Sequence, residues 1–192
     1  KYPKIAILSD EIYSEIIFNN LSMPSLVKYN SIRDRLILLD GWSKTYCMTG
    51  WRLGWSLWPK KFIEFANKLA VNSYSCPSSI SQYAGIEALK GPQDEIKKII
   101  SEFEKRKIYI HAELNKLKKI RCFLPGGAFY AFPNISKTNM SGEKFADIAL
   151  NDFGVAIVPG SSFGNTADDF VRLSYANSME NIEKAIYRLS QI

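Results

Sequence analysis

The block DGWSKTYCMTGWRLGW, residues 40–55, brings together several side chains that can do chemistry. Lys44 directly follows Ser43, and Arg52 stands within a Gly-Trp-Arg-Leu-Gly-Trp run. A lysine amine whose pKa is lowered can attack a carbonyl carbon, and the planar arginine guanidinium binds phosphate or carboxylate oxygens in pairs. The block is therefore the first candidate for a functional site.

A second group of polar side chains points to the same place. Asp10 and Tyr13 lie just after the first strand that the sequence predicts, and Ser43 and Lys44 lie just after the second. In open α/β sheets, ligands bind beyond the carboxyl ends of the strands. Asp10 and Tyr13 would face opposite sides of a regular strand, so we expect the chain to turn already at Asp10.

An alternation of strands and helices must position these side chains. Two nearly continuous apolar runs, residues 4–8 and 35–41, are typical of strands covered on both faces in a parallel sheet. Further strands are expected at residues 52–58, 155–159 and 170–176, with two more within 121–135. Helices are expected at residues 59–72, 76–89, 92–120 and 142–153, and from a cap at Asn177 or Ser178 to the end. The first of these helices is expected to bury an apolar inner side, namely Phe62, Ile63, Phe65, Ala66 and Leu69.

The composition indicates a globular chain and excludes several classes of protein. Of the 192 residues, 46% are hydrophobic and 23% are charged, which suffices to bury a core. The net charge is +6, but the lysines concentrate in residues 97–107 and 115–121, where they resemble a solvated helix face, so we predict no nucleic-acid binding. The three cysteines are far apart and form no Cys-x-x-Cys motif, so neither a disulfide framework nor a metal site is expected. No apolar run approaches ~20 residues and no signal peptide is visible, so we predict no membrane span and a cytoplasmic location.

Five blocks together resemble a known family. SDEIY, SKTYCMTGWRLGW, PGGAFYAF, PGSSFG and VRLSYA occur in the order and approximate spacing of the class I/II pyridoxal-phosphate-dependent aminotransferases of fold type I, the aspartate aminotransferase-like enzymes. The resemblance covers essentially the whole chain but only the carboxyl-terminal half of the family's usual length, so we expect a fragment or cleaved product of a longer enzyme. It implies an α/β fold in which residues 1–105 form part of the large cofactor-binding domain, with a mainly parallel sheet and flanking helices. Residues 106–192 would form the small α+β carboxyl-terminal domain.

The resemblance assigns five residues to the cofactor pyridoxal 5'-phosphate. Lys44 matches the catalytic lysine that forms the Schiff base and then moves a proton at the substrate α-carbon. Ser43 and Arg52 match positions that hold the cofactor phosphate. Asp10 matches the carboxylate that pairs with the pyridine nitrogen, and Tyr13 matches the phenol that hydrogen-bonds the ring oxygen. The structural alternatives are an ion pair for Arg52, a turn for Ser43, a helix cap for Asp10 and a packed tyrosine.

The resemblance places the substrate-binding residues in the second half of the chain. Arg172 matches the arginine that binds the substrate α-carboxylate as a bidentate pair, and Phe163 is expected to line the substrate pocket. The alternatives are an ion pair for Arg172 and a plain turn for Phe163. Val71 stands where some aspartate-specific relatives place an arginine, which argues against that route to dicarboxylate specificity.

The resemblance implies an aminotransferase that moves an amino group from an L-amino acid to a 2-oxo acid, with aspartate among the candidate donors. It also implies a homodimer whose active site is completed across the two-fold axis. A lyase or decarboxylase built on the same site is one alternative, since a fold does not fix the reaction. A non-catalytic aminotransferase-like sensing module is the other.

Overall fold

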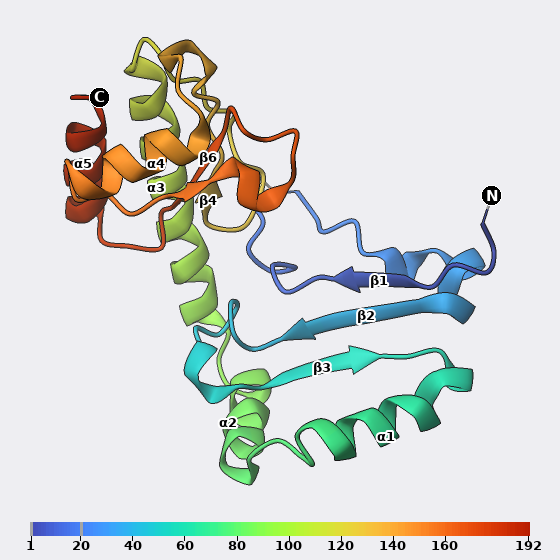
Figure 1. Ribbon diagram of the computed structural model, residues 1–192. Helices are drawn as coiled ribbons and strands as arrows, with labels where there is room; N and C mark the ends of the chain where they lie inside the picture. Colours follow the sequence, from blue (N-terminus) through green and yellow to red (C-terminus); the bar gives the residue numbers. More distant parts are fainter. Residues whose placement is uncertain (1, 20) are drawn as a thin grey trace. The chain divides into compact units, whose positions relative to one another are not determined.

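The computed structural model describes residues 2–19 and 21–192, and the chain forms two compact units, Lys1–Lys98 and Ile99–Ile192 (Figure 1). The boundary falls within the long helix α3 (Asp94–Lys116). The domain division after residue 105 stays a prediction, because compactness alone does not define a domain.

The first unit contains a sheet of three short strands. They are β1 (Ile7–Asp10), β2 (Leu36–Gly41) and β3 (Gly54–Leu57), in the spatial order β1-β2-β3. β1 and β2 run parallel, whereas β2 and β3 run antiparallel. The expectation of a mainly parallel sheet is therefore wrong for the described residues. A parallel neighbour needs a crossover, usually a helix, but the connection from β2 to β3 contains only the short 3₁₀ turn η3 (Thr49–Trp51).

The first apolar run is less covered than its sequence suggests. Leu36 and Leu38 of β2 are buried, but Ile5 and Leu8 are exposed, at 57% and 61%. β1 lies at the edge of the sheet, so within the described residues it has a strand on one side only. The apolar run correctly predicts a strand, and the prediction that both of its faces are covered is wrong here.

The chain leaves β1 because a buried carboxylate anchors the turn. Glu11 is only 4% exposed, and its Oε1 accepts hydrogen bonds from Ser9 Oγ and from the Leu26 amide, both at 3.0 Å. The Ser14 amide then donates to the Glu11 carbonyl at 2.8 Å, which closes the turn. Asp10 still pairs with Leu39 as the last residue of β1, so the chain turns one residue later than expected. The two 3₁₀ turns η1 (Leu26–Lys28) and η2 (Asn30–Arg35) lead on to β2.

Two helices follow the sheet of the first unit. The 3₁₀ turn η4 (Lys60–Phe62) precedes α1 (Ile63–Ser73), and α2 (Ser79–Lys90) comes next. The expected inner side of α1 is wrong in part, since Ile63, Phe65 and Leu69 are exposed. The periodicity supports the helix, but no described residue covers its apolar face.

Helix α2 packs on the block that carries the candidate lysine. Trp42 Nε1 donates to the Gly85 carbonyl at 3.0 Å, and a Cβ on Gly85 would come within 2.3 Å of the Leu53 side chain. Glycine therefore permits this close approach. The contact fixes residues on both sides of the block against one helix.

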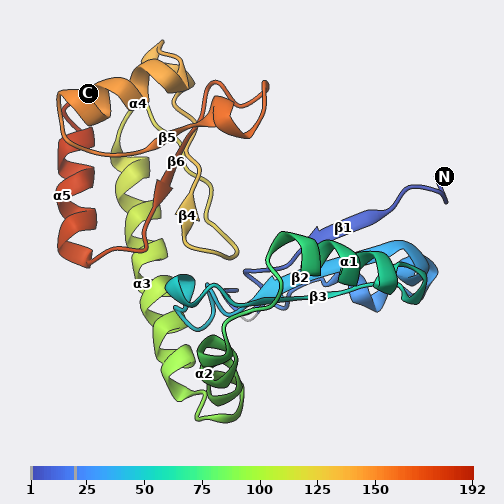
Figure 2. The same ribbon diagram turned by 60° about the horizontal axis from the view of Figure 1, so that its bottom comes forward.

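The second unit combines a short antiparallel sheet with three helices. The sheet has β4 (Tyr130–Ala131), β6 (Val171–Ser174) and β5 (Val158–Pro159), in that spatial order. The helices are α3, α4 (Gly142–Asn151) and α5 (Met179–Leu189), and they gather around the sheet (Figure 2). The 3₁₀ turns η5 (Ser136–Thr138) and η6 (Gly160–Phe163) complete the elements. Within residues 121–135, the two expected strands shorten to β4 and an isolated bridge from Arg121 to Asn134.

The apolar residues of this unit form a closed core. Helices and strands that are distant in sequence contribute fully or nearly buried side chains, among them Phe103, Leu114, Phe145, Ala149, Val171, Tyr175, Ile182 and Leu189. Ser178 caps α5, since its Oγ accepts from the Asn181 amide at 3.2 Å. No helix in residues 2–19 and 21–192 is both long and apolar enough to cross a membrane.

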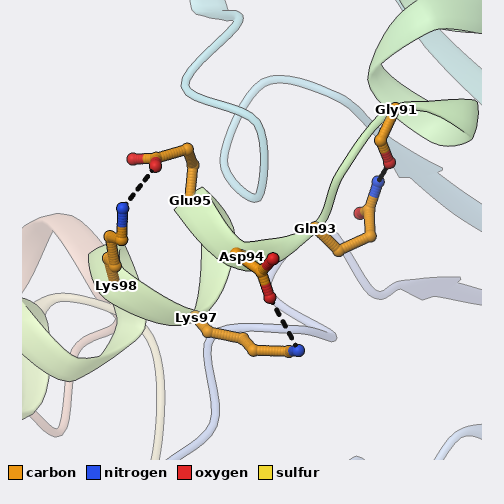
Figure 3. Close-up of polar contacts among 6 residues, drawn as sticks. All are labelled: Gly91, Gln93, Asp94, Glu95, Lys97 and Lys98. Atoms are coloured by element: carbon orange, nitrogen blue, oxygen red, sulfur yellow. Dashed lines mark hydrogen bonds and ion pairs between the residues drawn. The ribbon is translucent and has the colours of Figure 1, made fainter.

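The start of α3 follows the expected charge pattern. Figure 3 shows Asp94 and Glu95 in the first turn, bonded to Lys97 at 3.1 Å and to Lys98 at 2.6 Å. Gln93 Nε2 donates to the Gly91 carbonyl at 2.7 Å just before the helix. Carboxylates at the amino-terminal end of a helix interact favourably with the helix dipole, but exposed ion pairs of this kind contribute little stability.

Candidate active site

The candidate site is a cavity of about 410 Å³ at the carboxyl ends of β1 and β2. It is lined by Asp10, Ile12, Leu39, Asp40, Ser43, Lys44, Thr49 and Arg52. β1 and β2 run parallel and pair Asp10 with Leu39, so the segments that follow the two strands leave the sheet at the same end. Four of the residues that the sequence assigns to the cofactor thus lie around one cavity.

Tyr13 joins this group through its contact with the lysine. Lys44 Nζ lies 5.9 Å from the centroid of the Tyr13 ring. Both side chains are half-buried. The turn at Glu11 therefore brings the tyrosine beside the amine, although the residues are far apart in sequence.

Arg52 lies in an unusual backbone conformation. Its φ of 52° and ψ of 47° are left-handed, which is uncommon for a residue with a side chain. Its Nη1 donates to the Thr49 carbonyl at 2.9 Å, which curls the side chain back over η3. Backbone strain of this kind concentrates at functional sites.

Asp40 and Thr49 are cavity residues that the sequence analysis missed. Asp40 Oδ2 accepts from Ser14 Oγ at 3.0 Å, and Oδ1 accepts from the Gly41 amide at 2.6 Å. The carboxylate therefore ties the turn that carries Tyr13 to the end of β2. Asp40 and Thr49 both lie inside the block of residues 40–55, and that position is the feature of the sequence that could have indicated them as site residues.

Tyr46, in the same block, lies close enough to Asp40 of the cavity to be affected by its charge. Burial, together with the carboxylates of Glu15 and Asp40, raises the pKa of the Tyr46 phenol above its usual value. Its hydroxyl donates to Gln93 Oε1 at 3.4 Å. The phenol thus stays neutral and links the block to the segment before α3.

Arg172 and Phe163 belong to the second unit, whereas the cavity belongs wholly to the first. The Arg172 guanidinium carbon lies 4.5 Å from the Tyr130 ring centroid and 4.7 Å from that of Phe163. The structure therefore brings Arg172 and Phe163 together. That they share a ligand with Lys44 stays a prediction.

The cavity gathers a distinctive set of polar groups. It offers one amine, one guanidinium, two hydroxyls and two carboxylates within a single concave surface. Among the described residues, no group of three or more His, Cys, Asp and Glu side chains is placed to hold a metal ion. The cations and hydroxyls suit a phosphate, and the amine suits a carbonyl carbon.

Comparison with known proteins identifies the family. The family model described as aminotransferase class I and II matches residues 1–189. The chain belongs to this family. Its members generally use pyridoxal phosphate.

Individual aminotransferases show how much of such an enzyme is present. The chain is 38% identical to an aspartate aminotransferase of Geobacillus stearothermophilus, over 96% of its own length and 48% of the relative's. It is 33% identical to an aspartate aminotransferase of Pyrococcus abyssi, over 98% and 49%. An aromatic aminotransferase structure from Pyrococcus horikoshii superposes with a TM-score of 0.93 at 34% identity, over 97% of this chain and 50% of that one. The chain thus spans about half the length of the aminotransferases it matches.

Proposed function

We propose that the chain is the lysine-bearing part of a pyridoxal-phosphate-dependent aminotransferase, which moves an amino group from an L-amino acid to a 2-oxo acid. One observation carries the proposal. Lys44 shares its cavity with Asp10, Ser43 and Arg52 in a chain that belongs to the aminotransferase family. An amine, a carboxylate, a hydroxyl and a guanidinium are the four kinds of group that this cofactor needs around it.

The residues of the cavity fit the cofactor. A phosphate carries two negative charges near neutral pH, and Arg52 with the hydroxyls of Ser43 and Thr49 supplies a cation and two donors for it. The Asp10 carboxylate would favour a proton on the ring nitrogen, and the Tyr13 phenol would hydrogen-bond the ring oxygen. When bound, pyridoxal phosphate supplies an aldehyde carbon and a cationic ring that accepts the electron pair of the substrate α-carbon.

Lys44 has two tasks in this proposal. Its amine would hold the cofactor by its aldehyde carbon, with loss of water, and once a substrate amine has displaced it, it would move the proton at the substrate α-carbon. Both tasks need the amine at the same place. The Ser14–Asp40 hydrogen bond joins the turn at Glu11 to the end of β2, and so holds together the two segments that surround the amine.

Arg172 is the proposed anchor of the substrate α-carboxylate. A guanidinium binds a carboxylate through two parallel hydrogen bonds, which fixes the orientation of the amino acid. Two of the relatives are aspartate aminotransferases, so L-aspartate is the first donor to test. A homodimer in the cytoplasm completes the proposal, and light scattering and cell fractionation test those two points.

The proposal is tested by following nitrogen in the intact protein that carries this chain. The protein is loaded with pyridoxal phosphate and given ¹⁵N-labelled L-aspartate with 2-oxoglutarate as acceptor. We expect ¹⁵N in glutamate with the wild type and none with Lys44→Ala, while Lys60→Ala, an exposed lysine of the same unit, keeps the wild-type rate.

Other outcomes would point to other functions. Release of carbon dioxide without nitrogen transfer would indicate a decarboxylase on the same site. If neither occurs with aspartate, alanine or phenylalanine as donor, the aminotransferase proposal fails.

A further inference from the structure

Arg106 and Arg121 each lie over one aromatic ring, whereas two rings contact the guanidinium of Arg172. In the part of the chain that the structure describes, its guanidinium donates no hydrogen bond and has no ion pair, whereas it lies over two aromatic rings. By contrast, Arg35 and Arg188 donate to backbone carbonyls. Ring contacts use the flat faces of a guanidinium and leave its N–H groups available.

One ring comes from β4, which neighbours β6, and the other comes from η6, which directly follows the second neighbour, β5. Val171 and Leu173 of β6 are buried, so Arg172 projects from the other face of the sheet. Tyr130 lies on β4, where it pairs with Ser174, and is thus a diagonal neighbour of Arg172. Phe163 ends η6, directly after β5 on the other side of β6.

Further aromatic contacts hold the Phe163 ring. The Phe132 ring meets Phe163 edge-on at 5.8 Å, and it stacks on Phe170 at 5.1 Å with an interplanar angle of 7°. The backbone under Phe163 is fixed as well. A Cβ on Gly160 would lie 2.0 Å from the Ala167 carbonyl, so only glycine permits this packing.

The Tyr130 ring is held from the core side. It lies 4.8 Å from the Phe129 ring, which stacks on Phe103 at 5.4 Å. The buried Tyr175 donates from its hydroxyl to the Ala128 carbonyl at 3.1 Å, and from its amide to the Phe129 carbonyl at 2.9 Å. The segment that carries Tyr130 therefore has little freedom to move.

We infer that Tyr130 and Phe163 are positioning residues, which hold the Arg172 guanidinium by its faces and so present its N–H edge to a carboxylate. The ligand class is the α-carboxylate of an amino acid or a 2-oxo acid, and in naming it the inference rests on the proposed function. Holding the guanidinium in advance lowers the entropy that binding must cost. The rings should therefore set the affinity for the substrate rather than the rate of the chemical step.

The first test separates KM from kcat in the intact, cofactor-loaded protein. Phe163→Leu and Tyr130→Leu remove a ring, whereas Phe163→Tyr and Tyr130→Phe keep it. Each loss of a ring should raise the KM for the amino acid by about 2- to 30-fold, with kcat unchanged, and each ring-conserving variant should restore KM. Phe123→Leu is the matched control, because it removes a ring 5.4 Å from another guanidinium of the same unit, that of Arg121.

The second test needs no turnover and so stands apart from the proposed function. Phenylglyoxal modifies accessible guanidinium groups, and mass spectrometry follows the peptide that contains Arg172, with and without succinate as a carboxylate probe. We expect succinate to protect Arg172 in the wild type, less in the two leucine variants, and fully again in the ring-conserving variants. Because Phe163 is 50% exposed, we expect its truncation to leave the fold intact.

Each outcome decides one of the two claims. Protection of Arg172 in a protein that transfers no nitrogen would overturn the proposed function and leave the positioning pair standing. No protection in the wild type, or equal protection in the wild type and both leucine variants, would overturn the inference.

Discussion

The two units hold their key cations in different ways. In the first unit, Arg52 donates to a backbone carbonyl and Lys44 lies at the meeting point of two strand ends. In the second unit, Arg172 stands on the face of a sheet and is held by aromatic rings. A hydrogen bond occupies one donor of a guanidinium, whereas ring contacts hold its plane and leave all of its donors available for a ligand.

The units also differ in how they bury apolar surface. Helix α1 of the first unit buries no residue, whereas α4 and α5 of the second unit each bury several. Leu69 of α1 is 62% exposed, and Leu114 of α3 is 0% exposed. The second unit therefore derives its stability from its own core, and the first leaves apolar helix faces uncovered by any described residue.

The largest expected effect contrasts the two arginines. Arg172→Leu should lower affinity for the amino acid by about 100-fold or more while affinity for pyridoxal phosphate stays unchanged. Arg52→Leu should do the reverse, with cofactor affinity reduced by about 10- to 100-fold. Spectroscopic titration with cofactor, and then with amino acid, measures the two affinities. If either variant weakened both ligands equally, the assignment of Arg52 to the cofactor and of Arg172 to the amino acid would be wrong.

The contrast in burial predicts a difference in stability. Leu114→Ala should lower the free energy of unfolding by about 2–5 kcal/mol, because it opens a cavity in the core. Leu69→Ala should change it by no more than about 0.5 kcal/mol. Urea denaturation of the protein measures both values, and a comparable loss for Leu69→Ala would show that the face of α1 is covered after all.

A smaller effect is expected at the cap of α5. Ser178→Ala removes the acceptor of the Asn181 amide and should cost about 1 kcal/mol of stability. Ser178→Asp keeps an acceptor and should recover most of it. A Ser178→Ala protein as stable as the wild type would show that the cap contributes nothing to the second unit.

The smallest effect concerns alkaline pH. Burial, and secondly Cys122, raise the pKa of the Tyr175 phenol well above its usual value. The proton is thus bound more tightly in the folded chain, so the stability it contributes is complete below pH about 10 and is lost as the pH rises toward the folded-state pKa. Tyr175→Phe should flatten the fall in stability above pH 10, and Tyr46→Phe in the first unit should do so less. An unchanged slope in both variants would contradict the assignment.

The sequence predicts local features of this chain well. The periodic apolar residues of α3 and the cap at Ser178 both arise from neighbouring residues. The grouping of Asp10 with Lys44 was also predictable, because two parallel strands that end in polar residues must end at one edge.

Features that depend on residues distant in the chain could not be predicted from the sequence. The antiparallel direction of β3 depends on the path of the connection from β2, which contains only the 3₁₀ turn η3, and the hydrogen bond from Ser14 to Asp40 depends on the register of β1 and β2. The rings over Arg172 come together only through the order β4-β6-β5. An apolar helix face, as in α1, likewise indicates what can be buried but not what covers it.

The most direct test of the account asks which lysine binds the cofactor. The intact protein is incubated with pyridoxal phosphate and reduced with borohydride, and the adduct is located by peptide mass spectrometry in the wild type, Lys44→Ala and Lys60→Ala. We predict one adduct, on the peptide that contains Lys44, in the wild type and in Lys60→Ala, and none in Lys44→Ala. An adduct on another lysine, or folded wild-type protein that stays unmodified at saturating cofactor, would contradict it.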